Sequence, residues 1–275
     1  AALAFRCLRR LCFGNVSYGN HRDGTAESVA ALTRADVVNQ HARIVCAQNA
    51  VLAVAGDIDP AAVRALAEHL FADMPAGQPA AMVATPAQQA GDEHVPADKE
   101  QTVIALALPG CTATGDDVPL QLLFEEWCRD MAGPVFGELR EKRGLAYYAA
   151  ATSLLGTDAG CLYFYLGTDP ARAAEARTAL EEVLNHLAQS GMPAEALERS
   201  RATALSGRLL SLQSCAKRCE GMAVNTLLGL SADYDDAVPE LLRAVTPEAM
   251  NAFIARTLAP TVTRTWVMVG ANGDL

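Results

Sequence analysis

Arg140 and Tyr147 are the two residues whose types and spacing are best suited to chemistry. They lie seven positions apart (147 − 140 = 7) in the stretch VFGELREKRGLAYY, residues 135–148. A guanidinium and a phenol both donate hydrogen bonds, so elements that bring them together would place two donors in one cleft. The alternative interpretation is structural, with Arg140 paired to a nearby carboxylate and Tyr147 packed in the core. Because single motif matches have many false positives, both interpretations stay open at this point.

The elements that must position the pair are predicted from the same stretch. Phe136 and Leu139 have helical spacing, and the charged residues around them form the other face of a helix. Gly144 suits a helix C-terminus, where a positive φ is favoured, and basic residues fill the last turn before it. A strand then begins at about Tyr147. This arrangement puts Arg140 near the end of a helix, next to the start of the adjoining strand.

No other residues form a recognisable catalytic or metal-binding pattern. The residue four before His69 is Ala65, and neither H-E-x-x-H nor H-x-x-E-H occurs in the sequence. Cys215 and Cys219 are four apart on a predicted helix, but two further ligands at matching spacing are missing. There is no G-x-S-x-G elbow and no phosphate-binding glycine loop. We therefore predict no catalytic residue, no metal ligand and no bound cofactor in this chain. Its histidines are His21, His41, His69, His94 and His186.

The composition disfavours several kinds of partner. The chain has 275 residues, 51% of them apolar, and a formal net charge of −10. Its basic residues form no block, so we expect no nucleic-acid partner, which would need a basic surface. No run of about 18 apolar residues occurs, so we expect no membrane span. The cysteines are scattered, mostly within apolar runs, as free thiols in a reducing compartment are. This slightly favours the cytoplasm and leaves the periplasm open. They are Cys7, Cys12, Cys46, Cys111, Cys128, Cys161, Cys215 and Cys219.

The order of helical and strand patterns predicts an α+β fold in two parts. Residues 76–98 are rich in Pro, Ala, Gly and Gln and lack periodicity, so we expect a linker there. The predicted division is residues 1–75, this linker, and a complete domain at residues 99–275. Short apolar runs predict strands at residues 50–55, 101–108, 147–155, 161–168 and 262–269.

Capping residues predict where several helices begin. Thr33 and Asp36 have the spacing of a capping box, and Asp59 precedes a proline that suits a first helical position. Thr246 has the same place before a later helix. Helices are predicted at residues 1–13, 33–44, 60–71, 117–131, 135–143, 170–189, 193–228 with a break near 211–214, 236–244 and 247–258.

Two segments of the chain have nearly the same pattern. In each, a threonine-capped helix is followed by a strand that ends in glycine, with Thr33 and Gly56 in the first and Thr246 and Gly270 in the second. The offsets are 246 − 33 = 213 and 270 − 56 = 214. Such a repeat predicts two copies of one domain. The chain is therefore expected to hold the last third of one domain and all of the next.

The stretch at residues 135–148 resembles the (L/V)F-x-x-LRE-x-x-GLAY signature of the pitrilysin/insulinase-like zinc peptidases. The N-terminal part of the chain is similar to the end of a first domain in that family. The segments that carry this second likeness are Tyr18-Gly19, Gly24-Thr25-Ala26-Glu27-Ser28, Leu32-Thr33 and VLAVAGDID. The likeness covers nearly the whole chain. It implies tandem similar α+β domains, each an antiparallel sheet backed by helices, with the first copy truncated here.

In this family two halves close like a clamshell around a peptide, and one half binds zinc through an inverted H-x-x-E-H motif. The resemblance implies that the other half supplies Arg140 and Tyr147 as hydrogen-bond donors to the substrate or its oxyanion. The zinc motif would precede Ala1 or lie in a partner half, so this chain alone is not expected to hydrolyse a peptide bond. We therefore expect the substrate-binding C-terminal region of a zinc-dependent endopeptidase for peptides or small unfolded proteins. The alternative is a non-catalytic scaffold or partner subunit of a heteromeric complex.

Overall fold

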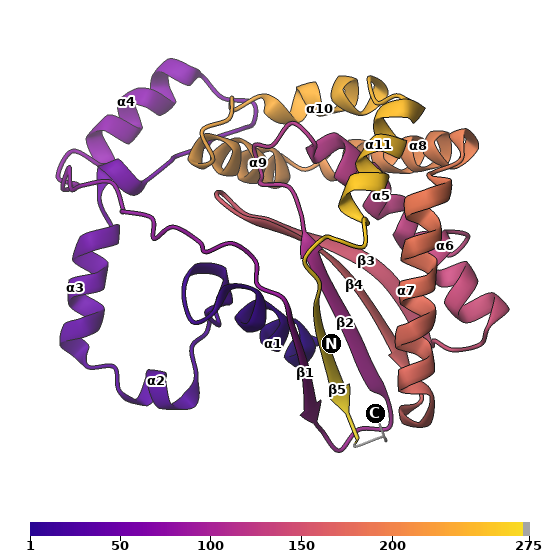
Figure 1. Ribbon diagram of the computed structural model, residues 1–275. Helices are drawn as coiled ribbons and strands as arrows, with labels where there is room; N and C mark the ends of the chain where they lie inside the picture. Colours follow the sequence, from indigo (N-terminus) through magenta and orange to yellow (C-terminus); the bar gives the residue numbers. More distant parts are fainter. Residues whose placement is uncertain (272–275) are drawn as a thin grey trace. The chain divides into compact units, whose positions relative to one another are not determined.

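The computed structural model describes residues 1–271, which separate into two compact units. Unit 1 consists of residues 1–21, 84–207 and the chain from residue 238 onward, and unit 2 of residues 22–83 and 208–237. Figure 1 shows the helices and strands of both. Each unit therefore draws on more than one stretch of the chain. The predicted division into residues 1–75, 76–98 and 99–275 concerns the order along the sequence and stays a prediction.

Unit 1 contains a five-stranded mixed sheet with the strand order β1-β5-β2-β4-β3. The strands are β1 (Gly91–Pro96), β2 (Thr102–Pro109), β3 (Tyr148–Leu155), β4 (Gly160–Thr168) and β5 (Thr265–Gly270). β5 pairs with β1 in parallel, and all other neighbours are antiparallel. The α+β class is thus confirmed, as is the predicted hairpin of β3 and β4. The expectation of a purely antiparallel sheet was wrong, because β1 runs parallel to β5.

β1 lies inside the stretch for which the sequence predicts a linker without regular structure. Its sequence, GDEHVP, has no run of large apolar residues, so no apolar alternation marks it as a strand. It is an edge strand that pairs with β5 alone, in the register Gly91↔Thr265 to Pro96↔Gly270. Backbone hydrogen bonding to a distant strand, rather than a side-chain pattern, therefore makes this segment a strand.

The helices that lie wholly or partly in unit 1 begin close to the predicted positions. They are α1 (Ala2–Phe13), α5 (Val118–Arg129), α6 (Pro134–Phe136), α7 (Ala173–Ser190), α8 (Ala194–Ser211), α10 (Tyr234–Arg243) and α11 (Pro247–Thr257). Short 3₁₀ turns lie at Ser17–Gly19 and Pro170–Arg172 in unit 1 and at Ala47–Asn49 in unit 2. Thr246 caps α11 by accepting from the Ala249 N–H, which confirms the predicted N-terminus. Among the described residues, no helix combines the length and apolar character needed to cross a bilayer.

Helices cover the sheet of unit 1 from both sides (Figure 1). Val103 and Ala105 of β2 belong to the core that α1 covers. On the other side lie α5, α7 and α11, and the rings of Phe124 and Phe164 meet there with centroids 6.3 Å apart. Burial on both faces explains why β2 is a continuous apolar run rather than an alternation of apolar and polar residues.

Unit 2 contains α2 (Ala26–Ala30), α3 (Arg34–Ile44), α4 (Pro60–Leu70) and α9 (Cys215–Leu227). The predicted capping is confirmed for α3, where Thr33 and Asp36 form a capping box. It is also confirmed for α4, where the Asp59 side chain accepts from the Ala61 N–H. The predicted break in the long helical stretch near residues 211–214 separates α8 from α9.

The predicted strand at residues 50–55 is not a strand in the structure. The backbone of residues 51–55 is irregular, and within residues 1–271 it makes no hydrogen bond to another backbone group. The prediction was wrong for the chain as described because a β-strand exists only when paired with another strand. No strand of unit 2 is available among the described residues to pair with it.

Candidate functional site

The stretch that carries Arg140 folds as the short helix α6 followed by a π-helix at Gly137–Lys142. In the π-helix the Arg143 N–H donates to the Glu138 carbonyl oxygen, five residues back, at 3.2 Å. The predicted α-helix is therefore replaced by a wider turn over most of its length. Gly144 ends the helix with φ +59°, as predicted. Because π-turns are frequent at functional sites, this stretch is the first candidate for a site.

The Arg140 guanidinium binds the backbone that leads into β3. Its Nη1 atom donates to the Tyr147 carbonyl oxygen at 2.5 Å and lies 3.4 Å from the Ala146 carbonyl oxygen. The Phe136 ring lies below the guanidinium, with 5.8 Å between Cζ and the ring centroid. The Glu141 carboxylate is 4.0 Å from Nε, which is beyond hydrogen-bond distance. The principal partner of Arg140 is therefore a backbone carbonyl rather than a carboxylate.

Tyr147 projects its side chain into solvent at the start of the edge strand β3. The residue is 54% exposed, and its N–H donates to the Gly167 carbonyl oxygen at 2.8 Å. The next residue, Tyr148, is half-buried, and its ring centroid lies 6.1 Å from that of Tyr165. Successive side chains along a strand point to opposite faces, which accounts for the difference. Tyr147 is therefore accessible, and Tyr148 is the residue of the two that packs against the sheet.

A cavity of about 730 Å³ borders the π-helix, α7 and the end of α5. Trp127 contributes apolar lining, and charged side chains surround it. Arg143 pairs with Glu138 at 3.3 Å and with Glu182 of α7 at 2.6 Å. Lys142 pairs with Glu138 at 2.8 Å, and this hydrogen bond lowers the pKa of the Glu138 carboxyl. Of these ion pairs, the one between Arg143 and Glu182 joins the end of the π-helix to α7.

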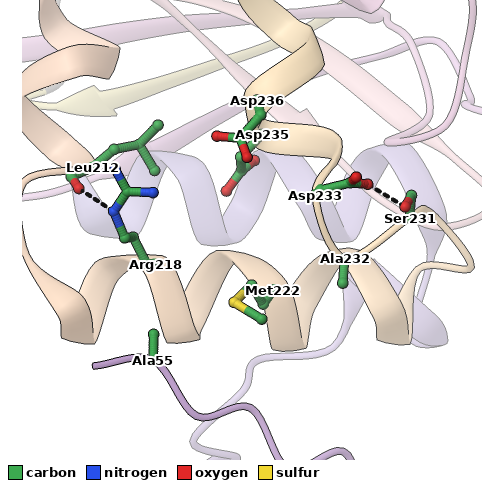
Figure 2. Close-up of a pocket in the computed structure, with 9 residues that line it drawn as sticks. All are labelled: Ala55, Leu212, Arg218, Met222, Ser231, Ala232, Asp233, Asp235 and Asp236. Atoms are coloured by element: carbon green, nitrogen blue, oxygen red, sulfur yellow. Dashed lines mark hydrogen bonds between the residues drawn. The ribbon is translucent and has the colours of Figure 1, made fainter. Parts of the chain in front are cut away.

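Unit 2 has a second cavity of about 470 Å³, which Figure 2 shows. It is lined by Ala55, Leu212, Arg218, Met222, Ser231, Ala232, Asp233, Asp235 and Asp236. Arg218 Nε donates to the Leu212 carbonyl oxygen at 2.8 Å, and Asp235 pairs with Arg208. A Cβ at Gly221 would lie 2.1 Å from Asp235 Oδ2, so α9 and α10 are in close contact here. We assign no binding role to this cavity, and one of its carboxylates, Asp235, is already paired with Arg208.

The residues that the structure describes do not form a zinc centre. Within the part of the chain that the structure describes, no three His, Cys, Asp or Glu side chains are placed to hold one metal ion. The donor set that zinc requires, three or four such ligands around one point, is therefore not assembled by these residues.

Two features of the site were missed from the sequence. The bond from Arg140 to the Tyr147 carbonyl was missed because spacing along a chain does not show which backbone oxygen a long side chain reaches. The cavity beside the π-helix is lined by Arg143 and Glu182, which pair across 39 residues of sequence. No local signal in the sequence identifies such a pair.

Comparison with known proteins gives relatives for nearly the whole chain. It is 28% identical over 254 residues to an uncharacterized zinc protease of Mycobacterium bovis. The match covers 90% of this chain and 57% of that protein. In structure it is similar to a peptidase M16 inactive domain from Pseudomonas fluorescens, with a TM-score of 0.89 and 21% identity over 98% of this chain and 65% of that chain. A protease from Helicobacter pylori matches with a TM-score of 0.86 and 14% identity, over 98% and 66% of the two chains.

These likenesses confirm the resemblance drawn from residues 135–148, although the chain spans only 57% of the length of its curated relative. Residues 31–204 match the family described as "Peptidase M16 inactive domain". This match covers 204 − 31 + 1 = 174 of the 275 residues, which is more than half of the chain. The chain therefore belongs to the family of peptidase M16 inactive domains.

Proposed function

We propose that this chain is the substrate-binding C-terminal region of a zinc-dependent endopeptidase that cleaves peptides or small unfolded proteins. In this proposal Arg140 and Tyr147 act across a cleft from a zinc-bearing half. Because residues 1–271 bring no zinc ligands together, the metal belongs to an earlier part of the same polypeptide or to a second subunit. The two halves enclose the peptide as a clamshell. Residues 1–75 are the end of one domain and residues 99–275 belong to a second domain, and residues 76–98 connect the two and supply β1 to the sheet.

The observation that carries the proposal is the bond between the Arg140 guanidinium and the Tyr147 carbonyl oxygen. It holds the backbone from which the Tyr147 phenol projects, while the Arg140 side chain stays 43% exposed. A guanidinium has five N–H donors, so donors remain for a substrate. Donors that are oriented before the reaction stabilise negative charge developing on a carbonyl oxygen. Tyr147 is thus a donor to the substrate, and Arg140 both a donor and the residue that positions Tyr147.

The edge strand beside the pair supports the binding of an extended peptide. β3 is the last strand in the sheet order, and its sequence, YAAATSLL, contains no charged residue and no proline. Edge strands in natural proteins are commonly protected by such residues. An unprotected edge suits a peptide that adds to the sheet as a further strand. The formal net charge of −10 favours basic substrates to a small degree.

The test is turnover of a quenched fluorogenic peptide by the complete protein assembled with its zinc-bearing half. Arg140→Ala and Tyr147→Phe are each expected to lower kcat by about 10²–10³-fold, the effect of removing one oxyanion donor. Arg140→Lys keeps the charge but loses the planar fork, so it is expected to fall between the wild type and Arg140→Ala. Circular dichroism should show that all three variants stay folded.

Two neighbouring residues provide matched controls. The Arg172 guanidinium also donates to a backbone carbonyl of this turn, that of Gly144 at 2.9 Å, and its side chain is 40% exposed. Arg172→Ala and Tyr148→Phe are expected to keep turnover within a few-fold of the wild type. Turnover by folded Arg140→Ala equal to that of Arg172→Ala would contradict the proposal.

A second candidate function is that of a non-catalytic scaffold or partner subunit. It is favoured by the match to a family described as inactive and by the lack of a zinc donor set in residues 1–271. A pure scaffold has no use for the Arg140–Tyr147 pair. Under this alternative, the variants of both residues would leave turnover unchanged, whereas removal of the whole chain would abolish assembly.

A further inference from the structure

A layer of thiol and hydroxyl side chains lies between α1 and the sheet of unit 1. Thr265 of β5, Ala107 of β2 and Tyr163 of β4 are register partners in one row across the sheet. Cys161 lies two residues before Tyr163 in β4, so its side chain points to the same face. Cys12, in the last turn of α1, belongs to the same buried cluster. Two thiols and a phenol therefore lie together beneath one helix.

The two thiols of this layer are in contact. The Cys161 thiol donates a hydrogen bond to the Cys12 sulfur, and this bond lowers the pKa of Cys12, with a further contribution from Thr265. The same bond, together with burial, raises the pKa of Cys161. Both cysteines are 0% exposed. Because the thiolate is the nucleophilic form of cysteine, Cys12 is the attacking thiol of the pair and Cys161 is the thiol that can close a bond to it.

An irregular stretch before β1 bridges the two elements that carry these thiols. The Cys161 sulfur lies 3.4 Å from Gln88 Oε1, and the Gln89 N–H donates to the Cys12 carbonyl oxygen at 3.0 Å. Gln88 is half-buried and Gln89 is exposed. Irregular surface segments held by few hydrogen bonds open at low cost in free energy. Local opening of this stretch therefore gives a small solute a path to the buried pair.

Tyr163 adds an unused donor to the same layer. The residue is 4% exposed, and its hydroxyl has no hydrogen-bond partner among the described residues. Burial raises the pKa of this phenol, so it keeps its proton at neutral pH. Buried polar groups are normally paired, and this hydroxyl is therefore available to a small oxygen-bearing molecule that enters the layer.

We propose that Cys12 and Cys161 are a redox site that hydrogen peroxide converts into a disulfide. The Cys12 thiolate attacks one oxygen of the peroxide, the O–O bond breaks, and Cys12 becomes a sulfenic acid. The hydroxide that leaves takes up the proton that Cys12 gave and becomes water. The Cys161 sulfur then attacks the Cys12 sulfur, the S–O bond breaks, and the second oxygen leaves as water with the Cys161 proton. The two thiols are thereby oxidised by two electrons, and the peroxide is reduced to two water molecules.

The disulfide ties the end of α1 to the start of β4, across 161 − 12 = 149 residues of sequence. The site lies wholly in unit 1 and uses neither Arg140 nor Tyr147. It therefore stands apart from the proposed function.

Peptide mapping of the wild-type chain tests the proposal. The chain is treated with hydrogen peroxide, its remaining thiols are blocked with N-ethylmaleimide under denaturing conditions, and its peptides are analysed by mass spectrometry without reduction. The expected product is the Cys12 peptide joined to the Cys161 peptide, lighter than the two separate peptides by two hydrogen atoms. Oxidation of the exposed Cys215 shows that the treatment was effective. Cys128 is also 0% exposed but has no thiol bonded to it among the described residues, so it is the matched control and is expected to stay reduced.

Thermal unfolding gives an independent measurement. A disulfide that closes a long loop restricts the unfolded chain, so the Tm of the oxidised chain is expected to rise by about 4–16 °C and to return after treatment with dithiothreitol. Cys12→Ala and Cys161→Ala are each expected to abolish both the cross-link and the rise, and Cys128→Ala neither. Complete blocking of Cys12 and Cys161 in a sample whose Cys215 is oxidised would overturn the proposal. A disulfide from Cys161 to Cys7, or one between two chains, would also overturn it.

Discussion

Replacing Gly160 by alanine is expected to destabilise unit 1, because the start of β4 lies directly against the backbone that follows β2. A Cβ at Gly160 would lie 1.8 Å from the Cys111 carbonyl oxygen and 3.0 Å from the Gly110 carbonyl oxygen. Ordinary van der Waals contact begins at 3.4 Å, so the two segments must separate by about 3.4 − 1.8 = 1.6 Å. The atoms that clash belong to the backbone, so a change of side-chain rotamer does not relieve the contact.

The size of the effect follows from the hydrogen bonds that this separation breaks. The Gly110 N–H donates to the Gly160 carbonyl oxygen at 3.0 Å, and the Cys111 N–H donates to Gln121 Oε1 at 2.8 Å. Gln121 is 1% exposed, so loss of its partner leaves a buried polar group unsatisfied. One lost hydrogen bond and one unsatisfied buried group together correspond to about 2–4 kcal/mol. At about 2–4 °C per kcal/mol, the expected fall in Tm is about 4–16 °C.

Urea unfolding followed by circular dichroism measures this effect, with Gly207→Ala as the control. Gly207 lies within α8, and a Cβ there would have no heavy atom within 4 Å. Gly207→Ala is therefore expected to stabilise the protein by about 0.5–1 kcal/mol through helix propensity. An unfolding midpoint for Gly160→Ala equal to that of the wild type, with an unchanged slope, would refute this reasoning.

Three further measurements test individual features of the structure. Partial burial raises the pKa of the half-buried Cys111 to about 11, so iodoacetamide is expected to modify the exposed Cys215 before Cys111 at neutral pH; labelling of Cys111 as fast as that of Cys215 would contradict this raised pKa. Thr246→Ala removes the N-cap of α11 and is expected to lower the free energy of unfolding by about 1 kcal/mol, measured in urea, and no change would show that the cap bond is not formed in solution. The bond from Lys142 lowers the pKa of Glu138, so this pair stabilises the fold above the ordinary carboxyl value of 4.5, and its contribution is lost as the pH falls through the lowered folded value. Lys142→Ala is accordingly expected to lower the Tm at neutral pH and not in acid below that window, and an equal loss at both would argue against an ionic interaction.

Local features of the sequence determined where most helices begin and end. Thr33 with Asp36, and Asp59 before Pro60, are capping arrangements within three residues of one another, and both are present in the structure. Gly144 likewise ends the helix of the motif with a positive φ. Such signals act over one turn of backbone, so their outcome depends little on the rest of the chain. The family resemblance of residues 135–148 is of the same kind, because it rests on residue types and spacing alone.

Pairing between distant segments was decided only by the tertiary structure. Residues 91–96 have no apolar alternation. They form β1 because their backbone pairs in parallel with β5. Residues 50–55 carry a clear strand pattern, yet they stay unpaired among the described residues, where no strand adjoins them. The hydrogen bond from the Arg140 guanidinium to the Tyr147 carbonyl oxygen was also seen only in the folded chain. The reason for the two strand segments is that a strand is completed by a partner that the local sequence does not contain. For Arg140 the partner is only seven residues away, but residue types and spacing do not specify which backbone oxygen a long side chain reaches.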